Sequence, residues 1–179
     1  QDALSDRHPI LFHSALSSSI NIGLLSPHEV IRYALSIDTP IASKEGFIRQ
    51  IIGWREFVRA IYVLEGRTMA DKNVLGHAKT MSDAWMEGQT GIPIVDLTIR
   101  KLMRHAYTHH IERLMVLGNL MMLSNIDPMD VHTYFMATHI DAYHWVMAPN
   151  IFGMSQFSAG ALMTTKPYFS GSNYLLRMV

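Results

Sequence analysis

The sequence predicts an all-α fold, and three observations support this class. Apolar residues recur at helical spacing over long stretches, notably 44–64 and 109–123. Signals for helix starts recur as well, such as the capping-box spacing at 26–29 and the Asp-Pro pair at 127–128. The sequence also lacks any alternating apolar–polar pattern long enough for a strand, and it lacks internal repeats. We therefore expect one multi-helical domain over residues 1–179.

Composition and charge exclude several classes of protein. With 49% hydrophobic and 17% charged residues, the chain is not a disordered segment. The formal net charge is zero, so any contact with nucleic acid must come from a local basic surface. The sequence contains no cysteine, which excludes disulfides and thiolate metal sites, and we expect no metal site of another kind. No apolar run approaches the roughly 20 residues that cross a bilayer, so we expect no membrane partner.

The first half of the chain contains two predicted helices and a long connection. The capping box predicts a helix over 27–35, opened by a proline. The proline-containing stretch 37–43 is predicted to be a loop, and the apolar periodicity then predicts a long helix over 44–64. Glycine and polar residues at irregular intervals over 65–87 favour an extended connection with short helical pieces.

The second half of the chain contains three predicted helices. One begins at Pro93, another near His109, and the third runs from the Asp-Pro pair to about residue 138. After Pro149 the sequence is rich in glycine and serine, so we expect loops around short helices there.

Polar residues fall inside the apolar arc of the helix predicted over 44–64. On a wheel at about 100° per residue, Gln50, Arg55 and Arg59 project into this arc beside Trp54. A single such residue is most simply a side chain that snorkels to solvent. Three of them beside a tryptophan indicate a helix that lines a polar pocket.

Arg113 lies on a predicted helix that is apolar on nearly all sides and is therefore deeply buried. An unpaired buried guanidinium is costly, and its planar fork favours a carboxylate partner. Asp141 is the best candidate for that partner. The pair can be purely structural, or it can also face a cofactor.

Two more stretches carry residues suited to a pocket. His109 and His110 would point about 100° apart on a helix, which is poor geometry for chelating one metal but suits proton transfer. Two structurally satisfied histidines are the alternative. The hydroxyl-rich stretch 13–19 could hold a phosphate at a helix N-terminus, although serine runs are more often caps or surface residues.

Three motifs together resemble the flavin-binding helical domain of the photolyase/cryptochrome family. They are FIRQIIGWREF at 47–57, GQTGIPIVD at 88–96 and AYTHHIER at 106–113, and their order and spacing agree over nearly the whole chain. The stretches DAYHWVMAPNIFGMSQF at 141–157 and TKPYFSGSNYLLRM at 165–178 favour the bacterial (6-4) photolyase group. The resemblance implies an all-helical domain that binds FAD folded into a U, here without the N-terminal antenna domain and the C-terminal end.

The resemblance also implies roles for residues of this sequence. His109 and His110 match the histidine pair of (6-4) photolyases, of which His110 would face the flipped photoproduct. Lys166 and Tyr168 match a segment on the lesion side. The residues implied to bind the cofactor are Ser14, Leu16 and Ser17 at the diphosphate, Gln50, Trp54 and Arg55 on the long helix, and Arg113, Asp141, Tyr143 and Met147 beside the flavin ring.

The activity that the resemblance implies is light-driven repair of (6-4) pyrimidine photoproducts in UV-damaged DNA. Reduced FAD would pass an electron to an extruded lesion, a histidine would supply a proton, and the electron would return. We expect a cytoplasmic monomer. The alternative is a cryptochrome-like blue-light receptor that binds FAD and signals without repair. A flavin-free helical fragment is a third reading, and it requires that Ser14, Arg113 and Asp141 lie far apart.

Several positions depart from the pattern of the family. Met147 stands where relatives place a polar or acidic side chain near the flavin N5 atom. Tyr134 and Phe135 occupy the positions of an electron-transfer tryptophan and tyrosine, so we expect another route for flavin photoreduction. Ala15 replaces a common arginine. Ile94 replaces a cysteine that binds an iron–sulfur cluster, so no cluster is expected.

Overall fold

The computed structural model describes residues 3–178, and in this part of the chain it contains helices and no strand. The predicted all-α class is therefore confirmed. Three π-helical segments, η1 (Gln50–Trp54), η3 (Glu112–Gly118) and η4 (Ile151–Ser155), and a 3-10 turn, η2 (Met69–Asp71), accompany the α-helices. The α-helices are α1 (Ser17–Asn21), α2 (Pro27–Ser36), α3 (Ile41–Arg49), α4 (Arg55–Glu65), α5 (Ala84–Glu87), α6 (Pro93–His105), α7 (Asn119–Leu123), α8 (Pro128–Thr138), α9 (His144–Asn150) and α10 (Ser172–Leu176).

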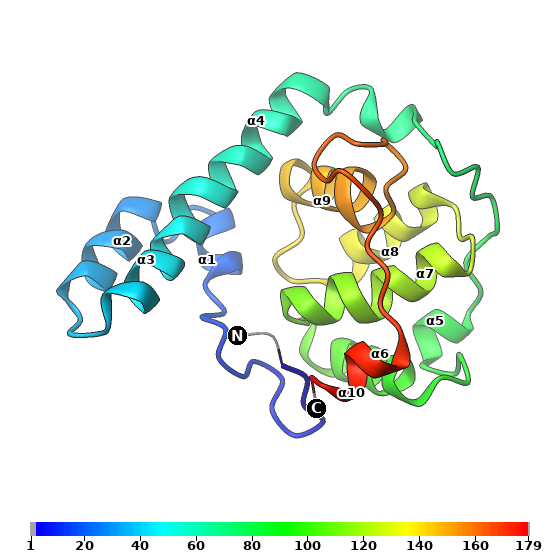
Figure 1. Ribbon diagram of the computed structural model, residues 1–179, viewed down its shortest axis with the longest axis horizontal. Coiled ribbons are helices and arrows are strands. Elements are labelled where there is room, and N and C mark those ends of the chain that lie inside the picture. Colours follow the sequence, from blue (N-terminus) through cyan, green and yellow to red (C-terminus); the bar gives the residue numbers. More distant parts are fainter. Residues whose placement is uncertain (1–2, 179) are drawn as a thin grey trace.

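One long helix and a bundle of shorter helices make up the molecule (Figure 1). The long helix consists of α3, η1 and α4 in direct succession, and α2 folds back against its first half. In the bundle, η3 packs against α6 and η4, and α8 packs against α9 and η4. The two groups are joined where α4 packs along α9. The two ends of the described chain also meet, because the Leu4 amide donates to the Met178 carbonyl at 2.7 Å.

The start of α2 follows the predicted capping box. Ser26 Oγ accepts a hydrogen bond from the Glu29 amide at 3.2 Å, and the Glu29 carboxylate accepts one from the Ser26 amide at 2.8 Å. The next helix begins at Ile41, three residues earlier than predicted, with Pro40 at its N-cap. A proline at this position loses nothing, because the first amides of a helix have no partner within it. The predicted loop over 37–43 is therefore shorter than expected.

Gln50 and Arg59 do not project into the apolar arc as the wheel predicted. Arg59 is exposed, and its Nε lies 3.0 Å from the carboxylate of Glu56, three residues before it on α4. Residues three apart share a face of an α-helix, so Arg59 belongs to the solvent-facing side with Glu56. Gln50 is also exposed, whereas Arg55 is half-buried.

The helix that passes through Pro149 was not predicted. The structure forms α9 and η4 in direct succession, whereas the sequence predicted loops around short helices after Pro149 and no helix that leads into this proline. An interior proline costs about 3 kcal/mol. In the same turn the side-chain amide Nδ2 of Asn150 donates to the Val146 carbonyl at 2.8 Å. Burying Ile151 and Phe152, each at most 3% exposed, contributes about 1.5–3 kcal/mol per side chain. Core burial therefore outweighs the local signal for a loop.

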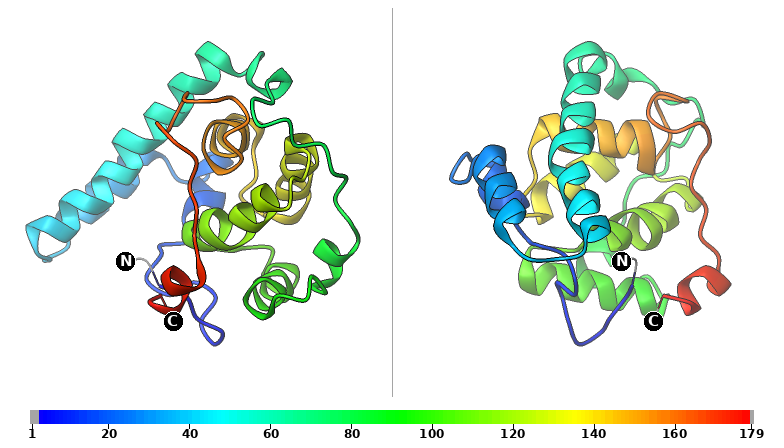
Figure 2. Two further views of the ribbon diagram at one scale, coloured as in Figure 1. Left: turned by 45° about the vertical axis from the view of Figure 1, so that its right-hand side comes forward. Right: turned by 60° about the vertical axis from the view of Figure 1, so that its left-hand side comes forward.

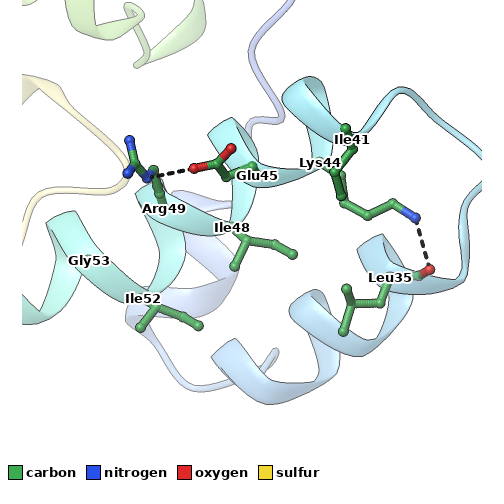
Figure 3. Close-up of a pocket in the computed structure, with 8 residues that line it drawn as sticks. All are labelled: Leu35, Ile41, Lys44, Glu45, Ile48, Arg49, Ile52 and Gly53. Carbon is green, nitrogen blue, oxygen red and sulfur yellow. Dashed lines mark hydrogen bonds and ion pairs between the residues drawn. The ribbon is translucent and has the colours of Figure 1, made fainter.

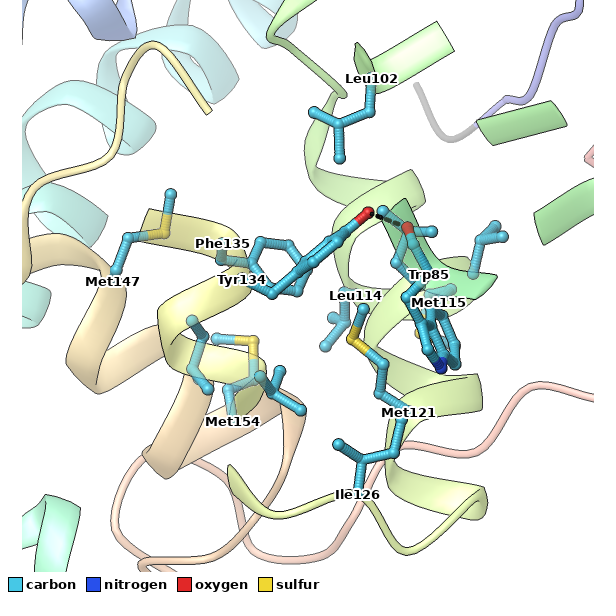
Figure 4. Packing of buried hydrophobic residues seen from close by; sticks show 14 of the residues in the cluster. Trp85, Leu102, Leu114, Met115, Met121, Ile126, Tyr134, Phe135, Met147 and Met154 are labelled. Carbon is cyan, nitrogen blue, oxygen red and sulfur yellow. Dashed lines mark hydrogen bonds between the residues drawn. The ribbon is translucent and has the colours of Figure 1, made fainter. Parts of the chain in front are cut away.

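The core lies between α6, η3, α7, α8 and η4 and is rich in methionine (Figure 4). Tyr134 and Phe135 pack inside it, and the Tyr134 hydroxyl donates to the Trp85 carbonyl at 3.1 Å. This bond links α8 to the short helix α5, so the connection predicted over 65–87 is held to the bundle from within. The fully buried members are Met69, Ile99, Leu102, Leu117, Met121, Val131 and Phe152.

A glycine lets η3 and η4 approach each other closely. A Cβ at Gly118 would collide with Ser155 Oγ and would lie 2.8 Å from the Arg113 carbonyl oxygen. The Gln156 side chain donates to the Gly118 carbonyl at 3.0 Å, which satisfies an acceptor at the same contact. Ser155 and the Arg113 carbonyl belong to the two helical segments that this hydrogen bond joins. Neither group can move away from a new Cβ without breaking the bond or shifting its helix.

Gly118→Ala should therefore destabilise the fold by about 1–3 kcal/mol, as overpacking of a core does. Gly53→Ala is the matched control, because nothing lies within 4 Å of a Cβ at that helical position. The control should leave the free energy of unfolding unchanged or raise it by up to about 1 kcal/mol. Urea unfolding curves of both variants measure the difference, and a Gly118→Ala protein as stable as its parent would contradict the packing described here.

Candidate cofactor and substrate site

Asp141 lies at the centre of a buried polar cluster formed by segments that are far apart in the sequence. Its carboxylate accepts a hydrogen bond from Ser17 Oγ at 2.6 Å and lies 3.0 Å from Arg113 Nη2. Its backbone carbonyl accepts a bond from Asn21 Nδ2 at 2.9 Å. The ion pair expected between Arg113 and Asp141 is therefore present, and α1 is attached to it.

The Arg113 guanidinium is oriented by more than its counter-ion. Its Nε donates to the Thr108 carbonyl at 2.6 Å, and it stacks 5.2 Å from the centre of the Tyr107 ring. Burial raises the pKa of Tyr107, so this ring remains neutral beside the ion pair. The side chain of Arg113 is 18% exposed, which makes it a buried cation with one accessible side.

Asn21 connects the long helix to this cluster, a link that sequence reasoning missed. Its Oδ1 accepts from Arg55 Nη1 at 2.8 Å, while its Nδ2 donates to Asp141. Arg55 also lies 4.6 Å from the centre of the Trp145 ring on α9, and burial lowers the pKa of this arginine. An amide side chain both donates and accepts, so Asn21 can join the Arg55 guanidinium to the backbone carbonyl of Asp141. Nothing in the sequence pattern singles out this one.

The other predicted cofactor residues differ in how deeply they are buried. Trp54 is half-buried and packs on Phe57 at 5.6 Å, while Gln50 at the start of η1 is exposed. Of the hydroxyl segment, Ser17 reaches the cluster, Leu16 is half-buried and Ser14 is exposed. Ala15 between them has a left-handed backbone with a φ of 54°. Tyr143 is half-buried at the N-cap of α9, and Met147 is 4% exposed on the same helix.

His109 and His110 have opposite surroundings, although they are adjacent. His110 is exposed, whereas the His109 ring is buried and stacks on His13 with ring centres 4.5 Å apart. Burial, together with His13 and nearby cations, lowers the pKa of His109 to about 3. His109 is therefore neutral near pH 7, and only His110 faces solvent.

A buried ion pair beside His109 also escaped the sequence analysis. Lys101 on α6 pairs with Glu112 in η3, and their side chains are 8% and 2% exposed. Burial raises the pKa of Glu112, and Lys101 opposes this shift. The signal that could have found Glu112 is its spacing, since a glutamate three residues after a helix start is typical of a cap.

Lys166 and Tyr168 are exposed on the segment 164–171, which crosses the helix of η3 and α7 (Figures 1 and 2). Ser170 anchors this segment, because its Oγ donates to the Met115 carbonyl at 2.6 Å. Asn119 binds both the amide and the carbonyl of Ser170, at 3.0 and 3.2 Å. The segment is thus tied to the element that carries Arg113, although Lys166 and Tyr168 are not part of the Asp141 cluster.

Three of the positions that depart from the family pattern lie in or against the core. Tyr134 is buried, and burial raises its pKa. Phe135 stacks on His139 with ring centres 5.0 Å apart. Ile94 on α6 packs against the core. Tyr134, Phe135 and Ile94 thus each pack against apolar residues of the core.

A surface pocket between α2 and the first half of the long helix is separate from this cluster (Figure 3). Its rim carries an ion pair between Arg49 and Glu45 at 3.3 Å and a bond from Lys44 to the Leu35 carbonyl at 3.1 Å. None of its lining residues contacts Asp141 or Arg113. The Asp141 cluster, with its converging charges, is therefore the candidate site.

Residues 3–178 lack two features that are typical of other classes of protein. No helix in this range is long and apolar enough to span a bilayer. The same residues contain no group of three histidine, cysteine, aspartate or glutamate side chains that could hold a metal ion.

Comparison with known proteins agrees with the geometry. A family profile described as the FAD binding domain of DNA photolyase matches residues 47–178, which is most of the chain. The chain belongs to this photolyase family. FAD is therefore its cofactor, and the resemblance found in the sequence is confirmed.

Curated photolyases match over nearly the whole chain. A (6-4) photolyase of Agrobacterium fabrum is 42% identical over 182 residues, 99% of this chain and 36% of the relative. Deoxyribodipyrimidine photo-lyases of Escherichia coli and Alkalihalophilus pseudofirmus are 29% and 27% identical, each over 87% of this chain and about a third of the relative. The chain thus spans about a third of the length of these relatives.

Two buried histidines should make the fold sensitive to mild acid. Burial lowers the pKa of both His109 and His139 to about 3, well below the value of about 6.5 in an unfolded chain. The unfolded state therefore binds more protons, so stability is full above pH 6.5 and falls as the pH drops toward 3. From pH 7.5 to 5.5 the free energy of unfolding should fall by about 1.4 kcal/mol for each histidine.

Urea unfolding at the two pH values measures this loss. His139→Gln should lose part of the pH dependence, whereas the exposed control His105→Gln should keep all of it. Equal stability of the parent protein at pH 7.5 and 5.5 would show that these histidines are not buried in the neutral form.

Proposed function

We propose that this chain is the cofactor- and lesion-binding part of an enzyme that repairs (6-4) pyrimidine photoproducts in DNA with light. The observation that supports this most directly is the placement of His110. It is exposed and lies three residues before Arg113, so an accessible histidine borders the buried ion pair of the Asp141 cluster. The 42% identity to a (6-4) photolyase over nearly the whole chain agrees with this activity.

The residues of the Asp141 cluster suit the flavin part of FAD. Asp141 Oδ1 is buried without a hydrogen bond of good geometry among the described residues, although Arg113 Nη2 lies 3.0 Å away. A flavin ring carries both N–H donors and carbonyl acceptors at one edge, which match a buried carboxylate next to a guanidinium. Ser17, Arg55, Arg113 and Asp141 would hold the cofactor, with Tyr143 and Met147 beside it. When bound and reduced, FAD supplies the electron that light transfers to the lesion.

In this proposal the two histidines have different tasks. A base must leave the stack of a duplex to reach a protein pocket, and its unstacked face then meets surface side chains. His110 is accessible and can transfer a proton to the extruded lesion. His109 is buried and neutral, and it supports the turn that carries His110. The exposed Lys166 and Tyr168 would contact the DNA backbone and a base.

The activity can be tested by illuminating the reduced full-length protein with duplexes that carry either a (6-4) photoproduct or a cyclobutane dimer. We expect restoration of the (6-4) lesion under blue light and none in the dark. Restoration of the cyclobutane dimer alone would contradict the proposal. A protein that holds FAD but restores neither lesion would instead support the blue-light receptor.

His110→Ala should retain FAD and lose repair by about 10²–10⁴-fold, the range for removal of a group that transfers a proton. His105→Ala is the matched control, because His105 is also an exposed histidine but lies at the end of α6. The rate of lesion restoration per absorbed photon measures both variants. Undiminished repair by His110→Ala would overturn the proposed proton transfer.

A further inference from the structure

The buried pair of Lys101 and Glu112 is an expensive feature that fold stability does not explain. The two side chains are 8% and 2% exposed, so both charges have lost nearly all of their water. The desolvation of such a pair often exceeds its attraction, and apolar residues of similar volume often serve stability equally well. The cost of the pair therefore indicates a second role for the Glu112 carboxylate besides stability.

The second oxygen of Glu112 is directed at His109. Glu112 Oε2 accepts a hydrogen bond from the backbone amide of His109 at 3.3 Å and lies 3.4 Å from the Nε2 atom of the His109 ring. The helix begins at His110, so His109 is its N-cap and Glu112 occupies the third helical position. A glutamate at this position that binds the N-cap amide fixes the first turn of the helix. His110 is the first residue of that turn.

The N-terminal segment contacts both the ion pair and His109. Lys101 Nζ donates to the Ser5 carbonyl at 3.2 Å, and His13 stacks on His109 with only 8° between the ring planes. His109 is thus held by its backbone through Glu112 and by its ring through His13. His110 lies on this fixed first turn, so the direction in which its side chain leaves the helix is constrained as well.

We propose that Glu112, held by Lys101, is a positioning residue that fixes the first turn at His109 and thereby directs His110 toward the lesion. This inference rests on the proposed repair function. Lys101 keeps the carboxylate in place, Oε2 caps the His109 amide, and His110 projects outward from the capped turn. Neither Glu112 nor Lys101 needs to touch the DNA.

Double variants of the full-length, FAD-loaded protein separate positioning from stability. Lys101→Met with Glu112→Leu removes both charges and the cap acceptor, and Lys101→Met with Glu112→Met is a second apolar version. Lys101→Met with Glu112→Gln also removes both charges but keeps an oxygen for the His109 amide. Lys72→Met with Glu65→Leu is the matched control, because it removes an ion pair of the same types that is about 40% exposed.

Four quantities are measured on each protein: repair of the (6-4) duplex per absorbed photon, affinity for that duplex, FAD content, and hydrogen exchange of the His109 amide. In the apolar variants we expect repair to fall about 10- to 100-fold, the cost of misplacing a reacting group, and the amide to exchange at least about tenfold faster. Lesion affinity and FAD content should stay within about twofold. The glutamine variant keeps an acceptor for the His109 amide but lacks Lys101, so its repair and its amide exchange should lie between those of the apolar variants and the parent. The surface control should stay close to the parent in all four quantities.

Parental repair and a protected amide in a folded apolar variant would overturn the inference. Failure of both apolar variants to fold would overturn it too, since the pair would then be needed for folding itself. If the parent protein repairs no lesion, the proposed function fails. The exchange of the His109 amide in the leucine and glutamine variants still decides whether Glu112 fixes this turn.

Discussion

The carboxylate of Asp141 is charged and buried, and a buried charge must be met by donors at short distance. The carboxylate is met by Ser17 on α1 and by Arg113 on η3. Asn21 on α1 donates to the backbone carbonyl of Asp141 and extends the cluster to Arg55 on the long helix. One residue therefore joins three segments that are distant in the sequence. Loss of any of these donors would leave an acceptor of Asp141 unsatisfied.

The π-helical segments adjust side chains around this point. η1 ends directly before Arg55, and η3 contains Arg113. A π turn changes the direction of the side chains that follow it, and such turns occur often at functional sites. It also alters which carbonyl groups are bonded within the helix, and two carbonyls of η3 receive side-chain donors, from Ser170 to Met115 and from Gln156 to Gly118. These two side-chain hydrogen bonds therefore stabilise the irregular backbone of η3.

Much of this arrangement could be predicted from the sequence because its cause is local. The helix starts followed from capping residues and prolines, and the partnership of Arg113 with Asp141 followed from the cost of an unpaired charge in an apolar helix. Arg59 was misplaced, because it shares the solvent-facing side of α4 with Glu56, three residues before it. The helix through Pro149 was missed because its stability comes from core burial by residues after it.

Other parts of the site depend on contacts between distant segments, which no local pattern reveals. Asn21 is an ordinary polar residue until α1 is placed against Asp141. His109 and His110 are alike in sequence, and only the packing of His13 and Glu112 makes one buried and neutral. The family resemblance named the pair but not this division between them.

If the Asp141 cluster holds the flavin, as we propose, an Asp141→Asn protein should bind FAD more weakly than its parent. Asparagine keeps the shape and one acceptor but removes the charge that orients Arg113, so affinity should fall by at least about tenfold, as expected when a charged hydrogen bond is lost. Glu56→Gln, at an exposed ion pair on α4, should bind FAD like the parent. A folded Asp141→Asn protein that binds FAD with parental affinity would contradict the account.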